Sequence, residues 1–266
     1  MPPQEICLYE IMELHFSHNG NIFCADLTAG RDLTIRISSN GPRAWYVPPA
    51  RITPVLNQYF TGSVALGGQV NFNDVFFNPH GHGTHTETMG HITKHAVPIA
   101  DLNKFFFAAQ LITLSPERCS SQQGTTQIGD QIITAQQIRM ALHDNEFAPE
   151  ALLIRTIPND NSKLHRNYSN TNFPYLAAEA AAHLADNHVN HLLLDLPSVD
   201  REEDGGELAA HHAFWKNGDA SRSHCTITEM IFVPDDIADG HYLVQMVPAA
   251  FENDAAPSRI ILYPLR

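Results

Sequence analysis

Hydrophobic and polar positions follow two different periods along the chain. Residues 70–77 begin with strict period-two alternation, which is typical of a half-buried strand, and residues 33–37 also alternate in character. The remaining segments of strand length are largely apolar runs that predict strands, at residues 105–114, 151–157, 192–196, 226–233, 242–247 and 259–263.

Helical patterns lie between these strands. Thr134 is a candidate N-cap for a helix in which Ile138, Ala141 and Leu142 recur at helical spacing, and residues 175–187 are rich in alanine. The polar residues 158–172 are expected to form a surface loop within a domain. Helices inserted between strands predict a single layered α/β domain, residues 1–266, with a mixed sheet.

A dense group of histidines follows the strand predicted at residues 70–77. Residues 78–95 (N-P-H-G-H-G-T-H-T-E-T-M-G-H-I-T-K-H) contain five of the chain's 16 histidines and one glutamate. Imidazole nitrogens together with a carboxylate oxygen favour zinc, manganese or iron over calcium or magnesium. The segment therefore predicts a metal site.

The spacing within this group selects candidate ligands. His85 and Glu87 stand two residues apart, so an extended segment would direct both side chains to one face. His91 keeps the same parity as His85. His80 and His82 have the opposite parity, but the glycines beside them allow a turn or bulge that would direct one of them inward. A further ligand has to come from elsewhere in the chain.

The composition restricts the location and the partners. With 16 basic and 29 acidic residues the formal charge is −13, which disfavours nucleic acid or an anionic membrane surface as a partner. The first residues lack a signal-peptide pattern, and no stretch approaches the roughly 20 apolar residues that span a bilayer. The 4 cysteines are scattered and fit neither a metal knuckle nor a disulfide framework, so we expect a cytoplasmic location.

The histidine segment resembles the signature H-x-G-T-H-x-D-x-P-x-H of the metal-dependent cyclase and kynurenine formamidase family. Four positions match it: Gly83, Thr84, His85 and His91. Three positions differ, because Gly81 stands at the first histidine, Glu87 at the aspartate and Met89 at the proline. The resemblance implies the swivelling β/β/α fold of that family.

The resemblance also implies part of a ligand set. In the family the first two histidines and the aspartate bind metal, and the aspartate is able to bridge two ions. His85 and Glu87 would take two of these places, and His80 is the candidate substitute for the histidine missing at Gly81. Glu87 reaches one methylene further than aspartate, so an ion would sit differently or the site would hold one metal instead of two.

Two later regions extend the resemblance. Residues 194–200 (L-D-L-P-S-V-D) are similar to a strand-end D-x-x-S-x-D stretch of the family, and residues 210–229 contain a region similar to its late His and Glu segment. The resemblance assigns metal-ligand roles to His211 and Glu229, with His212 as the alternate to His211. We expect the acidic run at residues 200–204 (D-R-E-E-D) to be a solvated loop.

The resemblance implies a metal-dependent amidohydrolase similar to arylformamidases, with zinc, or else manganese, as the divalent cofactor. It suggests N-formylkynurenine as the substrate and tryptophan catabolism as the context, with His91 moving protons between water and the leaving nitrogen. The alternatives are hydrolysis of another small lactam or cyclic imide, and a non-catalytic protein of the same fold that binds metal or a small ligand. We expect a small-molecule substrate and a homo-oligomer.

One short string points to a different enzyme. Residues 81–85 (G-H-G-T-H) are identical to the segment around the catalytic histidine of subtilisin-like serine proteases, in which His82 would be the base. The chain contains no nucleophile segment of the G-T-S-M-A type, so we disfavour this interpretation. His82 and His95 are then expected to lie outside the metal site.

Overall fold

The computed structural model describes residues 12–142 and 147–266. The strands are β1 (Glu13–His18), β2 (Asn21–Asp26), β3 (Arg31–Asp32), β4 (Arg51–Pro54), β5 (Leu56–Asn57), β6 (Phe60–Thr61), β7 (Asn73–Phe76), β8 (His85–Thr88), β9 (Phe106–Leu114), β10 (Glu117–Arg118), β11 (Gln131–Ile133), β12 (Ala151–Thr156), β13 (Tyr175–Leu176), β14 (His191–Leu194), β15 (Thr226–Glu229), β16 (Gly240–Pro248) and β17 (Ala255–Pro264). The α-helices are α1 (Ala135–Ala141), α2 (Ala178–Asp186) and α3 (Ala209–Phe214).

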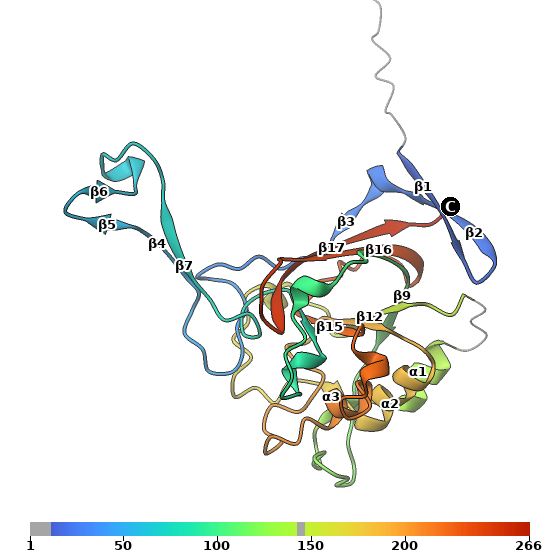
Figure 1. Cartoon of the computed structure of the whole chain (residues 1–266). Helices are drawn as coiled ribbons and strands as arrows, with labels where there is room; N and C mark the ends of the chain where they lie inside the picture. The colour runs from blue at the N-terminus through green and yellow to red at the C-terminus, as the bar shows by residue number, and fades with distance from the viewer. Residues whose placement is uncertain (1–11, 143–146) are drawn as a thin grey trace, which may run out of the picture.

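A closed mixed sheet forms the centre of the molecule (Figure 1). Its strand order is β16-β9-β12-β14-β15-β8-β17, and β16 also pairs with β17, so seven strands close into a barrel with β3 attached at its edge. β9, β12, β14 and β15 run parallel, whereas β8, β16 and β17 pair in antiparallel fashion. The predicted α/β class with a mixed sheet is confirmed.

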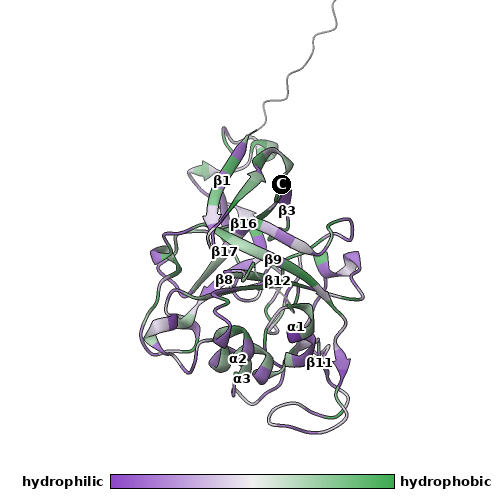
Figure 2. Ribbon diagram, turned by 90° about the vertical axis from the view of Figure 1, so that its right-hand side faces the viewer, coloured by the Kyte–Doolittle hydropathy of each residue, from purple (hydrophilic) through white to green (hydrophobic). Residues whose placement is uncertain are grey.

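Alternation along the buried strands separates two apolar layers. Leu153 and Leu193 belong to a cluster built by the barrel strands and their adjoining loops, which fills the barrel interior. Leu152 and Leu192 belong to a second cluster, which also contains residues of all three helices. Figure 2 shows the helices together below the barrel strands. The side chains of β8 and β15 that face this helical layer are the ones that can form a site between sheet and helices.

The helices begin where the sequence predicts them, with one difference. Thr134 caps α1, and its side chain and that of Gln137 bond reciprocally to each other's backbone amides in a capping box. The alanine-rich segment starts with the short strand β13 before α2 begins at Ala178. None of the helices in the described part of the chain has the length and apolar character needed to cross a membrane.

Three of the predicted strands differ from the structure, and one of them, expected at residues 226–233, ends already at Glu229. Residues 33–37 form no continuous strand, since β3 ends at Asp32 and Thr34 makes only an isolated bridge to Ile231. β7 exists, but its side chains are all exposed, so the expectation of a half-buried strand is wrong. β7 pairs with β4 alone, in an arm of residues 51–76 that projects from the barrel (Figure 1).

Candidate metal centre

β8 holds His85 and Glu87 at the boundary between the sheet and the helical layer. Both side chains are buried and point to one face of the strand, as the period of two predicts. The turn before β8 needs glycine at position 83, where φ is +62° and a Cβ would lie 2.9 Å from Ile35 O. Thr84 fixes the strand entrance by donating from Oγ1 to Met230 O at 2.5 Å.

His85 presents one ring nitrogen to the site. Its Nδ1 donates to Gly83 O at 3.1 Å, so in the neutral ring Nε2 carries the lone pair that a metal would bind. Nε2 is buried, lies 3.3 Å from Glu229 Oε2, and has no hydrogen-bond partner among residues 12–142 and 147–266. Glu229 stands directly opposite His85 in the β8–β15 pair. A buried imidazole nitrogen without a partner is costly unless something binds it.

Glu87 connects two histidines from different parts of the chain. Its Oε1 accepts from His211 Nε2 at 2.9 Å, and its Oε2 lies 3.0 Å from His80 Nδ1. His211 on α3 is oriented by Asp200, whose Oδ2 lies 2.5 Å from His211 Nδ1. The same carboxylate accepts the backbone amides of Ala210 and His211 at 2.6 and 3.1 Å. Asp200 therefore holds both the ring and the first turn of α3.

Asp254 completes the cluster from the segment that enters β17. Its Oδ2 lies 2.8 Å from His80 Nε2 and 3.3 Å from His91 Nδ1. β17 pairs with β8 so that Ala255 is opposite Glu87, which places the preceding aspartate beside the histidine segment. The sequence reasoning missed Asp254, because it lies far from the other residues in the chain and only the strand pairing brings it near.

The donor atoms form three overlapping groups, each with all atoms within 4.8 Å of one another. The groups are His80 with His85 and Glu87, Glu87 with His91 and His211, and His80 with His91 and Asp254. Glu87 belongs to two of them. The site therefore offers enough imidazole and carboxylate donors for more than one metal position.

The charges in the cluster are balanced by protons on the imidazoles. Burial lowers the pKa of His80, but the hydrogen bonds that His80 donates to Asp254 and Glu87 outweigh burial and raise the pKa to about 10. Burial likewise lowers the pKa of His211, yet the Glu87 carboxylate and Asp200 hold it well above its usual range. Burial raises the pKa of Glu87, but the positive charges of His91 and His211 hold it well below its usual range. A divalent cation supplies the same positive charge, so the donor set fits such an ion.

A pocket of about 350 Å³ opens onto these residues. Its lining includes His80, Glu87, His91, His211 and Glu229, and Trp45 and Leu208 add apolar surface. Trp45 packs edge-on against Phe173, with ring centroids 5.9 Å apart. The pocket thus combines apolar surface with the donor cluster, as small-molecule sites do.

Residues 31–201 match the sequence profile of the cyclase family. The chain belongs to this family. It is 30% identical to the kynurenine formamidase of Bacillus cytotoxicus over 199 residues, which cover 74% of this chain and 82% of that relative. The predicted family is confirmed.

Solved structures of similar fold include metal-dependent enzymes. A predicted metal-dependent hydrolase from Bacillus stearothermophilus superposes with a TM-score of 0.60 at 21% identity, over 88% of this chain and 97% of that one. An isatin hydrolase bound to the product analogue thioisatinate gives a TM-score of 0.58 at 14% identity, over 89% and 92% of the two chains. At these identities the likeness shows the fold, and the predicted β/β/α fold is confirmed.

The altered position 81 has a steric explanation. A Cβ at Gly81 would lie 2.9 Å from Val47 Cγ2, so a histidine there would require Val47 to move. His80, one residue earlier, reaches Glu87 instead. The structure thus brings the predicted substitute into the cluster of this cyclase-family chain.

The predicted site residues fall into two sets. The structure brings together the five candidate ligands and the candidate proton carrier, namely His80, His85, Glu87, His211, Glu229 and His91. The ring of His82 points away, between Pro48 O at 2.9 Å and the backbone of Asn78, so it is not placed as a protease base. His212, the alternate to His211, is absent from the pocket wall, and His95 is exposed.

The acidic run after β14 differs from its predicted role as a solvated loop. Asp200 is buried, and Arg201 bonds to the carboxylate of Asp130 at 2.9 Å. Glu202 accepts the backbone amide of Asn172 at 3.0 Å. The segment is a loop and Glu203 is exposed, but the expectation of solvation is wrong for Asp200, whose carboxylate bonds to His211 and to backbone amides of α3.

Proposed function

We propose that this pocket is the active site of a metal-dependent hydrolase that cleaves a small amide, with N-formylkynurenine as the favoured substrate. The observation that carries the proposal is His85 Nε2, which makes no hydrogen bond within the described residues and is buried 3.3 Å from Glu229 Oε2, in a cluster of imidazoles and carboxylates. The named activity of the Bacillus cytotoxicus relative supports the choice of substrate. The enzyme class agrees with the family to which the chain belongs.

The ligand assignment takes His80, His85, Glu87 and His211 from the donor groups and adds Glu229, which faces His85. His80, His85, Glu87, His211 and Glu229 would hold the metal, with Glu87 shared between groups. Several imidazoles with carboxylates favour zinc, and the same donors also suit manganese. A divalent ion held there would polarise the amide carbonyl and lower the pKa of a water molecule from about 15.7 to about 7, which makes hydroxide available at neutral pH.

His91 is placed to move the protons. Its side chain is 28% exposed, and its Nδ1 lies 3.3 Å from Asp254 Oδ2. The imidazole is therefore accessible from the pocket, while Asp254 orients the ring. The His91 ring lies 5.3 Å from that of His211, and His91 lines the pocket as a member of two of the donor groups. From this position His91 takes a proton from the attacking water and returns one to the leaving nitrogen.

The apolar part of the pocket accounts for selectivity towards an aromatic amide. Trp45 and Leu208 line the same pocket as the donor cluster. An aryl ring held against them would leave its amide carbonyl within reach of the donor cluster. The polar rim includes Ser198 and Arg201, although the Arg201 guanidinium already bonds to Asp130.

A second candidate substrate class is the lactams and cyclic imides. Glu87 replaces the shorter aspartate of the family signature, and its longer side chain alters the space around the carbonyl. The non-catalytic alternative has less support, because His80 supplies the imidazole that position 81 lacks.

The test is a hydrolysis assay on the metal-loaded protein. The panel contains N-formylkynurenine, a simple aryl formamide, a lactam and a cyclic imide, each with zinc and with manganese. The proposal predicts formate release from the formamides that stops when the metal is chelated. Faster opening of the cyclic amides would favour the second candidate. Stoichiometric metal without turnover of any amide would contradict both and favour the binding protein.

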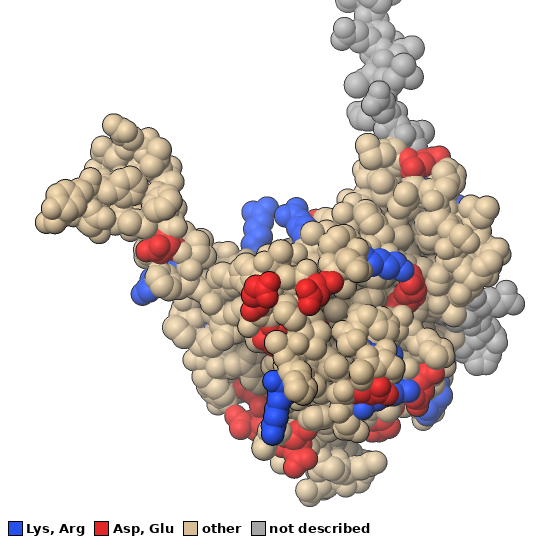
Figure 3. All heavy atoms as spheres, in the orientation of Figure 1, with Lys and Arg blue, Asp and Glu red and all other residues tan. Residues whose placement is uncertain are grey.

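We also propose that the chain forms a homo-oligomer through its projecting arm. Ten large apolar side chains of residues 51–76 are exposed: Ile52, Leu56, Tyr59, Phe60, Val64, Leu66, Val70, Phe72, Val75 and Phe76. Within these residues only Arg51 and Asp74 are charged, and Figure 3 shows the arm almost free of coloured charges. An exposed apolar surface of this extent is typical of a protein interface, and a second copy of the chain is the proposed partner.

A cytoplasmic location stays a prediction. Fractionation of cells that produce the protein tests it, with recovery in the cytoplasmic fraction as the expected result.

A further inference from the structure

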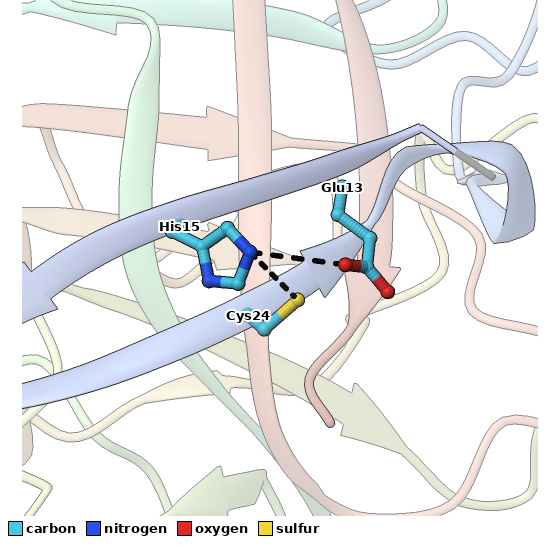
Figure 4. A group of neighbouring side chains, drawn as sticks. All are labelled: Glu13, His15 and Cys24. Carbon is cyan, nitrogen blue, oxygen red and sulfur yellow. Dashed lines mark hydrogen bonds and ion pairs between the residues drawn. The ribbon is translucent and has the colours of Figure 1, made fainter.

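The hairpin of β1 and β2 carries a second set of metal-ligating side chains. β1 pairs with β2 in antiparallel register, so that His15 stands opposite Cys24 and Glu13 opposite Asp26. Opposed residues and their neighbours two positions away share one face of a sheet, which puts all four side chains on the same side. Figure 4 shows Glu13, His15 and Cys24 pointing towards one another.

The opposite face of the hairpin fixes its position. Phe16 and Phe23 stack there with ring centroids 5.7 Å apart, and Phe23 also packs against Phe147 at 5.1 Å. The two strands are therefore anchored by apolar contacts behind the polar face. The donor atoms are presented by a paired and packed element of the fold.

The distances between the donor atoms suit a single small cation. His15 Nε2 lies 3.9 Å from Cys24 Sγ and 3.7 Å from Glu13 Oε2. Around a tetrahedral zinc ion, with bonds of about 2.3 Å to sulfur and about 2.0–2.1 Å to nitrogen or oxygen, these separations are about 3.6 and 3.4 Å. The observed separations exceed those values by only about 0.3 Å, which small side-chain rotations would remove.

The charges around the three donors also suit a divalent ion. Arg266 donates from Nη1 to Glu13 Oε1 at 2.9 Å and also bonds to Asp26, so Oε2 of Glu13 remains turned towards His15. With Cys24 as a thiolate, a divalent cation together with Arg266 would neutralise the thiolate and the two carboxylates. Arg266 thereby orients a ligand in the way that outer residues do at metal sites.

We propose that Glu13, His15 and Cys24 form a zinc-binding site on the β1–β2 hairpin, separate from the pocket at β8 and α3. The donor set combines thiolate, imidazole and carboxylate, which zinc accepts and which calcium and magnesium do not favour. The side chains of Glu13 and His15 are 36% and 64% exposed, so water completes the coordination and the site exchanges metal with solvent. Bound zinc would clamp β1 to β2.

Zinc has to displace a proton to bind there. Partial desolvation and the neighbouring Glu13 carboxylate raise the pKa of the Cys24 thiol above its ordinary value. The proposal stands on the donor geometry, and proton release accompanies binding as at other thiolate sites.

Cobalt(II) is the probe that separates this site from the pocket. Cobalt occupies zinc sites, and a thiolate ligand gives it an intense near-ultraviolet charge-transfer band. The donor cluster at the pocket contains only histidines and carboxylates, so cobalt bound there gives no such band. We expect the wild-type protein titrated with cobalt to show the band, and added zinc to remove it.

Matched variants decide the assignment. Cys24→Ser should abolish the band, whereas Cys119→Ser, which changes another partly exposed cysteine, should keep it. His15→Ala should weaken cobalt binding at least about tenfold, which corresponds to about 1.4 kcal/mol. Circular dichroism and unaltered amide hydrolysis check that the variants fold. Absence of the band in the wild type, or its persistence in Cys24→Ser, would overturn the proposal.

Discussion

Glu87 is the residue on which the geometry of the pocket depends most. Its two carboxylate oxygens contact His211 and His80, which come from α3 and from the loop before β8. Neither alanine nor glutamine at this position would offer a charged oxygen to both histidines. The side chain is also buried, so water cannot take over its contacts.

The first prediction concerns this carboxylate. Glu87→Gln keeps the size of the side chain but removes its charge, so we expect metal affinity to fall by about 100-fold or more and activity with it. Competition with a chromogenic chelator measures the affinity. Glu117→Gln, which changes an exposed glutamate on β10, is the matched control and should behave as the wild type. Equal affinity in the two variants would exclude Glu87 as a ligand.

The second prediction concerns the aspartate that the sequence reasoning missed. Asp254 contacts His80 and His91 with one oxygen. Asp254→Asn should therefore leave both imidazole rings in the site but weaken the contacts that fix their orientation. We expect kcat to fall by about 10- to 100-fold while KM changes little. Metal content measured on the same preparations should stay near that of the wild type. An unchanged kcat would show that Asp254 does not act on His91.

At the scale of residues, the sequence predicted the positions that depend on residue spacing within one strand and on a short motif. His85 and Glu87 face one side because β8 is extended, and this follows from a spacing of two. Asp254 and Asp200 could not be predicted in the same way. Their positions beside the histidines depend on the β17–β8 pairing and on the packing of α3, which no local pattern encodes.

At the scale of elements, a buried ion pair ties a loop to the ends of two parallel strands. Lys163 lies in a short 3-10 helix (Asn161–Leu164), and its Nζ contacts Asp195 Oδ2 at 2.6 Å just after β14. The ammonium also donates to Thr156 O, the last residue of β12, at 2.8 Å. Both charged side chains are almost fully buried.

The third prediction follows from this pair. Lys163→Met leaves the Asp195 carboxylate buried without its cation, and we expect the free energy of unfolding to fall by about 3–5 kcal/mol. Urea denaturation measures the change. The double variant Lys163→Met with Asp195→Asn removes both charges and should recover part of the loss. A loss below about 1 kcal/mol in the single variant would show that the pair is unimportant for stability.

The fourth prediction concerns acid stability. Burial, followed by repulsion from His224 and Lys104, lowers the pKa of His191 on β14 from 6.5 to about 3. The folded chain therefore holds this histidine neutral. Its contribution to stability is fully present above pH 6.5 and is lost as the pH falls towards 3.

The test compares the pH dependence of stability in His191→Gln with that in His95→Gln, which replaces an exposed histidine. Between pH 7 and pH 5 we expect the wild type to lose about 2 kcal/mol more than His191→Gln, at about 1.4 kcal/mol per pH unit below 6.5. The His95 variant should follow the wild type. Parallel pH curves for all three proteins would contradict the assignment.

Strand prediction succeeded where burial and pattern agree. β9, β12 and β14 are apolar because they are covered on both faces, and their positions agree with the predicted runs to within a few residues. β7 shows why a strand pattern does not predict burial. Its alternation is real, but the pattern does not reveal that the strand lies in an arm that nothing in the described chain covers.

At the scale of the whole molecule, the barrel is closed and compact, whereas the arm of residues 51–76 exposes most of its apolar side chains. The closed sheet follows from long-range pairing between β16 and β17, which the sequence does not specify locally. The arm has no partner layer within the described residues, so its apolar surface is available to a second chain.

The fifth prediction tests this interface. Leu56→Lys with Leu66→Lys places two charges on the arm, where both leucines are more than half exposed, and should reduce the mass measured by light scattering to that of one chain. The control, Ile128→Lys with Met140→Lys, changes exposed apolar residues elsewhere and should keep the oligomer. A wild type that is already monomeric would contradict the proposed assembly.

Above all, we propose that His85 and Glu87 hold a divalent ion in the pocket. Diffraction data collected on both sides of the zinc absorption edge, from crystals grown with zinc, test it most directly. We expect an anomalous peak within about 2.5 Å of His85 Nε2 and of a Glu87 carboxylate oxygen. Zinc found only at the hairpin, or no zinc within that distance of either side chain, would contradict it.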